Sequence, residues 1–265
     1  MERQAFEEYS RAFVQALAAF DNVMGVVALG STADPRIQDS WSDHDFAVVL
    51  RDGDPGEFLD DVSWMPEAEK IIASARHGGI YNVAVYNDGH KVEYLACNEA
   101  AAGSITVTKF LILLDRSGVA RRIQEARRLT IAHQHAISEV ACDPINLAIV
   151  VLTAGQRVQR GELVNATGLL AAAADMALKM LATTHNWELT DPLDPRRRLE
   201  HLHPDVAKEL SGILTASPDD AARRLLRLVG TAIRPKTPTW DWFGFDRVLQ
   251  TLPPQGEKGR PPAGS

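Results

Sequence analysis

The stretch VVALGSTADPRIQDSWSDHDFAVVL, residues 26–50, contains two apolar runs separated by polar residues. The first run ends at Gly30-Ser31, and the second begins directly after Asp43 and Asp45. Short apolar runs bounded by turn-forming residues predict buried strands. Because side chains alternate between the two faces of a strand, Asp43 and Asp45 are expected to point the same way.

Asp43 and Asp45 therefore predict half of a metal site. Two adjacent carboxylates repel each other near a core unless a cation lies between them. Mg²⁺ takes one or two protein carboxylates and completes its shell with water and phosphate oxygens. Gly30 lets the backbone approach a ligand closely, and Ser31 offers a hydroxyl and an N–H group to a phosphate. The residues alone leave open a simple turn followed by a solvated start of the strand.

Composition and charge exclude several classes of protein. The 265 residues, 45% hydrophobic and 24% charged, are enough for two globular domains. A net charge of −7 argues against broad binding to nucleic acid or to anionic membranes, and it favours a cationic substrate. Cys97 and Cys142 are the only cysteines, the N-terminus has no apolar signal core, and no apolar run reaches membrane-spanning length. We therefore expect a soluble, cytoplasmic protein with no membrane partner.

Up to Cys142 the patterns predict a mixed domain of strands and helices. A hairpin is expected at Asp88-Gly89, a strong turn signal between two β-rich runs. The chain is expected to become helical from Val119 onward. The other predicted elements are helices over 2–20, 57–64 and 67–76, strands over 22–29 and 45–50, and a strand within TKFLILLDRSG, residues 108–118.

The second half of the chain predicts a helical bundle. We place the domain boundary at Cys142-Asp143-Pro144, because an Asp-Pro pair can cap and open a new helix. Helices are predicted over 146–160, 162–184, 203–214 and 218–232. The expected fold class is α+β, with a mixed-sheet domain at 1–142, a helical C-terminal domain at 143–252 and a disordered tail at 253–265.

The order of these motifs resembles that of a known family. A strand, Gly-Ser, a short helical spacer, Asp-x-Asp at the next strand and a third acid on a later strand are typical of the nucleotidyltransferase superfamily represented by DNA polymerase beta. LGSTADPRIQDSWSDHDFAVVL, residues 29–50, is similar to that motif without gaps. NDGHKVEYLAC, residues 87–97, resembles the segment of aminoglycoside 6-adenylyltransferases that carries the third carboxylate. That position is Glu93 here, where the family commonly has Asp.

The resemblance implies a reaction in which an acceptor hydroxyl attacks the α-phosphate of ATP and pyrophosphate leaves. Asp43 and Asp45 would bridge two Mg²⁺ ions, and Ser31, beside Gly30, would hold the β- and γ-phosphates. Glu93 would bind metal and accept the hydroxyl proton. The residues leave another role open for Glu93, as an outward-facing hairpin residue paired with Lys91.

The acceptor that the resemblance implies first is a small hydroxylated molecule, an aminoglycoside-type antibiotic, which would make the protein a resistance enzyme. Two alternatives stay open. One is a nucleotidyltransferase that acts on a protein or an RNA end, although the acidic chain has no basic stripe for RNA. The other is a catalytically silent module that binds a nucleotide.

Four further candidates lie in the second half of the chain. Lys179 sits in an otherwise apolar helix and could reach phosphates, or its side chain could extend to solvent. Trp187, Asp191 and Asp194 lie in a loop that could offer stacking and carboxylates to a cationic sugar; packing is the alternative for the Trp. The aromatic residues at 240–245 predict an anchor on the bundle.

Overall fold

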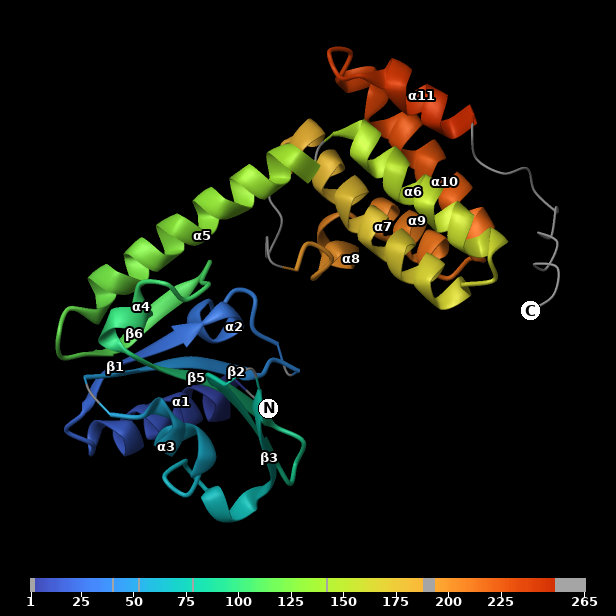
Figure 1. Ribbon diagram of the computed structural model, residues 1–265. Helices are drawn as coiled ribbons and strands as arrows, with labels where there is room; N and C mark the ends of the chain where they lie inside the picture. Colours follow the sequence, from blue (N-terminus) through green and yellow to red (C-terminus); the bar gives the residue numbers. More distant parts are fainter. Residues whose placement is uncertain are drawn as a thin grey trace, which may run out of the picture. The chain divides into compact units, whose positions relative to one another are not determined.

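Six strands form one mixed sheet in the first of the two units into which the chain divides, Met1–His133 and Gln134–Ser265 (Figure 1). The computed structural model describes residues 3–39, 41–51, 53–77, 79–141, 143–187 and 194–250. The predicted α+β class is confirmed by this sheet and the helices around and after it. The two units divide between His133 and Gln134, and the domain boundary at Cys142-Asp143-Pro144 stays a prediction. The predicted tail at 253–265 lies outside the described residues.

The order of the strands across the sheet is β3-β4-β5-β2-β1-β6. Strands β2 and β5 are parallel, and the other neighbouring pairs are antiparallel. The strand bounds are β1 Val23–Leu29, β2 His44–Leu50, β3 Ile71–His77, β4 Tyr81–Tyr86, β5 Lys91–Asn98 and β6 Phe110–Asp115. The strands predicted over 22–29, 45–50 and within 108–118 are confirmed, as is the hairpin at Asp88-Gly89.

The helix predicted over 67–76 is wrong. A 3₁₀ turn, η1 (Ala68–Lys70), is followed by the edge strand β3, which pairs antiparallel with β4. Gly79, with a φ of 81°, lies in the connection between the two strands, and a left-handed glycine of this kind suits a hairpin turn. Strand β4 supplies backbone partners for this segment, so sheet pairing overrides a weak local helical pattern.

Helices cover both faces of the sheet (Figure 1). Helices α1 (Arg3–Ala18) and α3 (Pro55–Asp60) pack with Phe46, Val48 and Leu50 of β2. Helices α4 (Glu99–Ala102) and α5 (Val119–Ala141) pack with Ala47 and Val49, the alternate residues of that strand. Odd-numbered residues of β2 therefore face α4 and α5. Asp45, the acid of this strand, lies on that side of the sheet.

The second unit is a bundle of helices around one apolar core. Its elements are α6 (Pro144–Gln159), α7 (Leu163–His185), α8 (Leu199–Leu202), α9 (Pro204–Leu214), α10 (Pro218–Ala232), η2 (Arg234–Lys236) and α11 (Trp242–Gln250). The four predicted helices correspond to α6, α7, α9 and α10. Trp242 and Phe245 are buried in the core as expected, whereas Phe243 is 74% exposed and does not act as an anchor.

Helix α7, among the described residues, is long and apolar enough to cross a membrane by length and composition. Half of its most apolar window is buried inside the structure, and nine of its residues belong to the buried set of the unit. This is the expected property of a central helix in a bundle.

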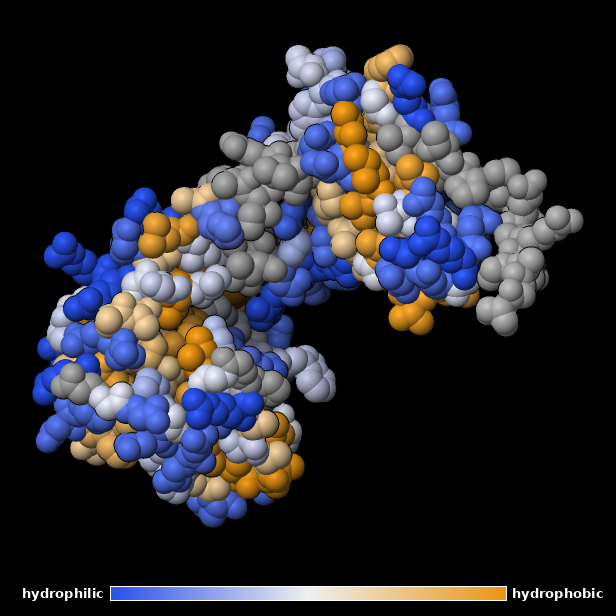
Figure 2. Space-filling model, in the orientation of Figure 1, coloured by the Kyte–Doolittle hydropathy of each residue, from blue (hydrophilic) through white to orange (hydrophobic). Residues whose placement is uncertain are grey.

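On the face drawn in Figure 2 the surface is mostly hydrophilic, with hydrophobic side chains in smaller groups.

Gly25 in β1 marks a close contact between the sheet and α5. A Cβ atom at this position would lie 2.7 Å and 2.9 Å from the two Cγ atoms of Val119, the first residue of α5. We predict that Gly25→Ala lowers the free energy of unfolding by about 2 kcal/mol, because the added methyl overpacks this contact. Urea denaturation measures the change.

Val119→Ala provides the matched control, because it removes the two Cγ atoms that the new methyl group would meet. The double variant should lose less stability than the sum of the two single variants, since the small residue accepts the methyl group. Strict additivity would contradict the contact between Gly25 and Val119.

Candidate active site

Asp45 and Glu93 are direct neighbours in the sheet. They are partners in the parallel pairing of β2 with β5, so both side chains lie on the face that carries α4 and α5. Asp43 precedes the first residue of β2. The Lys91 ammonium connects the group, with Nζ 2.9 Å from Asp43 Oδ2 and 2.5 Å from Glu93 Oε1. The structure therefore joins Asp43 and Glu93 through one lysine and sets Asp45 next to Glu93 in the sheet.

Gly30, Ser31 and Thr32 lie beside these carboxylates. They form helix α2 (Gly30–Ala33), a single turn at the end of β1. Gly30 has a φ of 52°, and a Cβ atom there would lie 3.4 Å from Asp45 Oδ2. Thr32 Oγ1 accepts from the Asp45 N–H at 2.8 Å and donates to the Asp43 carbonyl at 3.4 Å. Thr32, which the sequence analysis did not single out, thus ties α2 to the aspartate pair.

Ser31 is almost completely buried, with 1% of its surface exposed. Its Oγ has no hydrogen-bond partner among the described residues, although a buried hydroxyl normally has one. Thr32, the next residue, is the hydroxyl that fixes the backbone of the site. Ser31 Oγ is therefore an enclosed donor without a partner in the same turn as Gly30.

The donor set suits a hard divalent cation. Asp43 and Glu93 already converge on one positive charge, that of Lys91, and Gly30 leaves room beside Asp45. No group of three His, Cys, Asp or Glu side chains within the described ranges is placed to hold a metal ion. Mg²⁺ needs only one or two protein carboxylates, so the aspartate pair meets its requirement.

His44, between the two aspartates, points to the opposite face of the sheet. It is fully buried, and its ring stacks on Phe6 of α1 at 3.5 Å between centroids. His44 Nε2 lies 3.0 Å from the Phe6 carbonyl, which can only accept, so Nε2 carries the proton. His44 Nδ1 then accepts from His90 Nε2 at 2.7 Å. This pair connects the start of β2 to α1 and to the residue before Lys91.

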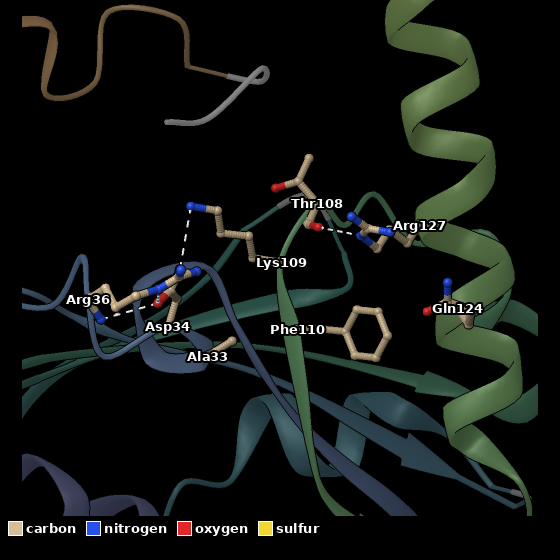
Figure 3. Close-up of a pocket in the computed structure, with 8 residues that line it drawn as sticks. All are labelled: Ala33, Asp34, Arg36, Thr108, Lys109, Phe110, Gln124 and Arg127. Carbon is tan, nitrogen blue, oxygen red and sulfur yellow. Dashed lines mark hydrogen bonds and ion pairs between the residues drawn. The ribbon is translucent and has the colours of Figure 1, made fainter. Parts of the chain in front are cut away.

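A pocket of about 430 Å³ lies at the other end of α2 (Figure 3). Asp34 is buried there and pairs with Arg36, whose Nε and Nη2 lie 2.9 Å from its two carboxylate oxygens. Lys109 Nζ is 3.7 Å from the same carboxylate. Arg127 of α5 donates from Nε to the Thr108 carbonyl at 2.9 Å. The residues that line the pocket are Ala33, Asp34, Arg36, Thr108, Lys109, Phe110, Gln124 and Arg127.

The two bonds from Arg36 hold the pKa of Asp34 at about 2, and Lys109 contributes to this shift. The carboxylate is therefore ionised at neutral pH. Sequence reasoning did not identify this pocket. Lys109 stood inside a stretch quoted for its strand, and Arg127 stood in a helix, and neither position carries a local signal of a site.

The candidates in the second unit have different surroundings. Lys179 is a partly exposed residue of α7. Trp187 stacks on His203 with 4.0 Å between ring centroids and packs against the core of the unit, which is the packing role that the sequence left open. Asp194 is exposed, and its carbonyl accepts from the Arg197 N–H. Asp191 and Cys142 lie outside the described residues, and Cys97 is a buried free thiol of β5.

No family model matches this chain, and no curated protein matches its sequence. Among solved structures, the chain is similar to an aminoglycoside 6-adenyltransferase from Bacillus subtilis, with 11% identity, a TM-score of 0.30 and coverage of 94% of this chain and 93% of that chain. It is also similar to a nucleotidyltransferase-like protein from Exiguobacterium sibiricum, with 13% identity, a TM-score of 0.35 and coverage of 92% of this chain and 78% of that chain. TM-scores this low decide neither fold nor function. The fold class rests on the sheet and helices described above, and the function is inferred from the residues of the site.

Lys91 competes with any cation that binds between Asp43 and Glu93. We predict that Lys91→Met tightens Mg²⁺ or Mn²⁺ binding to the nucleotide-free protein about fivefold, because a partly exposed ion pair contributes up to about 1 kcal/mol. Isothermal titration calorimetry measures the affinity. Lys70→Met is the control, because Lys70 of η1 forms an ion pair with Glu67, away from the site. Equal effects of the two variants on metal affinity would contradict competition at the site.

The buried His44 makes stability depend on pH. Burial lowers the pKa of His44 from 6.5 to about 3. Between these values the unfolded chain binds a proton that the folded chain does not. The contribution of His44 to the free energy of unfolding is therefore fully present above pH 6.5. It falls by about 1.4 kcal/mol per pH unit as the pH decreases toward 3. Burial lowers the pKa of His90 as well, which acts in the same direction.

Urea denaturation across this pH range tests the prediction. His44→Asn lacks the titrating ring, so its stability should depend less steeply on pH than that of the wild-type protein. Identical slopes for the two proteins would contradict a neutral, buried His44.

Proposed function

We propose that the chain is a Mg²⁺-dependent nucleotidyltransferase that transfers a nucleoside monophosphate, AMP from ATP, to a hydroxyl of a small molecule. The observation that carries this proposal is the pairing of Asp45 with Glu93 on one face of the sheet. Asp45 lies beside Gly30, and Asp43 is joined to Glu93 through Lys91. A sheet face can be stabilised by apolar residues alone. Acidic residues at these positions favour a catalytic or metal-binding role over a purely structural one. Asp45 in addition lies against Gly30, whose φ is positive.

Asp43 and Asp45 would hold the metal, with Glu93 as the third carboxylate. Bound Mg²⁺ would supply positive charge to the phosphate oxygens. The acceptor oxygen forms a bond to the α-phosphorus while the bond from that phosphorus to the bridging β-phosphate oxygen breaks. Pyrophosphate leaves with the bonding electron pair, and the hydroxyl proton passes to the Glu93 carboxylate and then to solvent. Lys91 would release Glu93 for this role.

For the acceptor we propose an aminoglycoside-type antibiotic. The net charge of −7 favours a polycationic molecule over nucleic acid, because opposite charges raise local concentration and association rate. The motifs of the chain also resemble those of adenylyltransferases that act on such compounds. A protein acceptor has no comparable support among the described residues, and the net charge of −7 counts against RNA.

A catalytically silent nucleotide-binding module is the second candidate. Lys91 is the observation that favours it, because its ammonium occupies the position of a cation between Asp43 and Glu93. In such a module Lys91 would replace the metal permanently. Incubation with labelled ATP, Mg²⁺ and a panel of aminoglycosides and lincosamides separates the two candidates, since only an enzyme yields nucleotidylated product and pyrophosphate.

We predict different effects for the aspartates and for Glu93. Asp45→Asn should lower turnover by about a hundredfold or more and weaken Mg-ATP binding, because the carboxylate would bind metal and nucleotide together. Glu93→Gln keeps the shape of the side chain but cannot take a proton, so it should lower kcat strongly and change Mg-ATP affinity only a few-fold. Single-turnover rates and equilibrium nucleotide binding measure both effects.

Asp60→Asn is the matched control, because Asp60 is an exposed carboxylate at the end of α3 that pairs with Arg76. It should behave like the wild-type protein. Transfer at the wild-type rate by Asp45→Asn would remove the aspartate pair from the mechanism. An unchanged rate for Glu93→Gln would assign the proton to another group or to solvent.

A further inference from the structure

We propose that the outer edge of β6 is an interface between two copies of this chain, which pair their β6 strands antiparallel about a two-fold axis. Strand β6 is the last strand in the order of the sheet and pairs with β1 on one side. No strand of the described residues lies on its other side. The inference is independent of the proposed nucleotidyl transfer, because Asp43, Asp45 and Glu93 lie outside β6.

The sequence of β6 makes this edge strongly apolar. Five large hydrophobic residues follow one another, FLILL at 110–114. None of the five is buried, and Leu111 is 49% exposed. The neighbouring strand β1 is buried over its first six residues. An edge strand presents unpaired N–H and C=O groups, and a hydrophobic one is a template for pairing with a further strand.

The opposite edge of the sheet, β3, is better protected against such pairing. Lys70 directly precedes β3 and Arg76 lies within it, and each forms an ion pair with an acid of its own chain. Charged side chains on an edge oppose the approach of another strand. The segment 110–114 of β6 contains no charged residue and no proline. A bulge in its pairing with β1 is a weaker protection, so we expect a reversible dimer.

The charges at the two ends of β6 favour a second copy as the partner. Lys109 directly precedes the strand, and Asp115 is its last residue. An antiparallel pair centred on Ile112 brings the Lys109 end of each copy to the Asp115 end of the other. The N–H groups of Ala120 and its neighbours in α5 hold the pKa of Asp115 below its usual range, so its carboxylate is charged at neutral pH. The Lys109 side chain is 34% exposed.

The same pairing is favourable at the centre of the strand. Leu111 lies opposite Leu113 of the second copy, and large apolar side chains on neighbouring strands stabilise their pairing. Arg116, directly after β6, is engaged within its own chain, because its guanidinium donates to three backbone carbonyls between residues 18 and 23. A two-fold interface uses the same surface on both copies and therefore closes as a dimer.

Sedimentation equilibrium of the full-length protein over a series of concentrations tests the interface. We expect the wild-type protein to show a reversible monomer–dimer equilibrium. Leu111→Lys should weaken association about tenfold or more, because a lysine within an edge strand opposes pairing. Ile72→Lys is the matched control, since Ile72 is an exposed residue of β3 at the other edge. It should associate as the wild-type protein does.

A second pair of variants tests the ends of the strand. Lys109→Glu should weaken association roughly tenfold, because an attraction becomes a repulsion at both ends of the two-fold interface. Lys70→Glu is its control: it also loses an ion pair with a nearby acid, but beside β3. Lys109 lies outside the apolar segment, so this variant keeps the test decisive if circular dichroism shows that Leu111→Lys fails to fold.

The outcomes are distinct. Weaker association of both β6 variants, with both controls unchanged, would support the interface. A monomer at every concentration would overturn it, as would a dimer that both β6 variants leave intact or that Ile72→Lys weakens equally. A dimer weakened by Leu111→Lys and not by Lys109→Glu would support the edge contact and overturn the antiparallel arrangement that joins Lys109 to Asp115.

Discussion

The parallel pairing of β2 with β5 is the constraint on which the candidate site depends. It sets Asp45 opposite Glu93 and brings Lys91 to Asp43. A slip of one residue would turn Glu93 toward α1 and the opposite core. Apolar residues on both faces prevent such a slip, because Phe46 and Val48 fill one core while Ala47 and Val49 fill the other. The position of the acids is thus a consequence of the packing of the strands that carry them.

Polar contacts hold the start of β2, where the apolar packing of the strand ends. Thr32 holds the backbone on both sides of His44, and His44 in turn is held by Phe6 and His90. The start of β2 is therefore bound from the α2 side through a hydroxyl and from the α1 side through an imidazole. Rigid support of this kind is what a site that orients metal and substrate requires.

Local signals predicted much of the first unit, and nonlocal contacts account for what they missed. Strands β1 and β2 follow from apolar runs with clear ends, and the hairpin follows from Asp88-Gly89. Strand β3 was expected to be helical because only its pairing with β4 defines it. The pocket could not be foreseen, since Lys109 and Arg127 meet only after β6 and α5 fold. For Glu93 the sequence offered both a metal ligand and a partner of Lys91, and the contact with Lys91 is present.

The pairing of β6 with β1 has a consequence for how the protein is made. The last strand of the sheet lies beside the first, so β1 has no partner on that side until the ribosome has released β6. The Gly30 N–H likewise has its acceptor, the Lys109 carbonyl, only after residue 109 has been synthesised. Long-range pairings of this kind form slowly and leave hydrophobic strands exposed during synthesis. The sheet of the nascent chain should therefore stay open on the β1 side until β6 and the start of α5 have emerged and cover it.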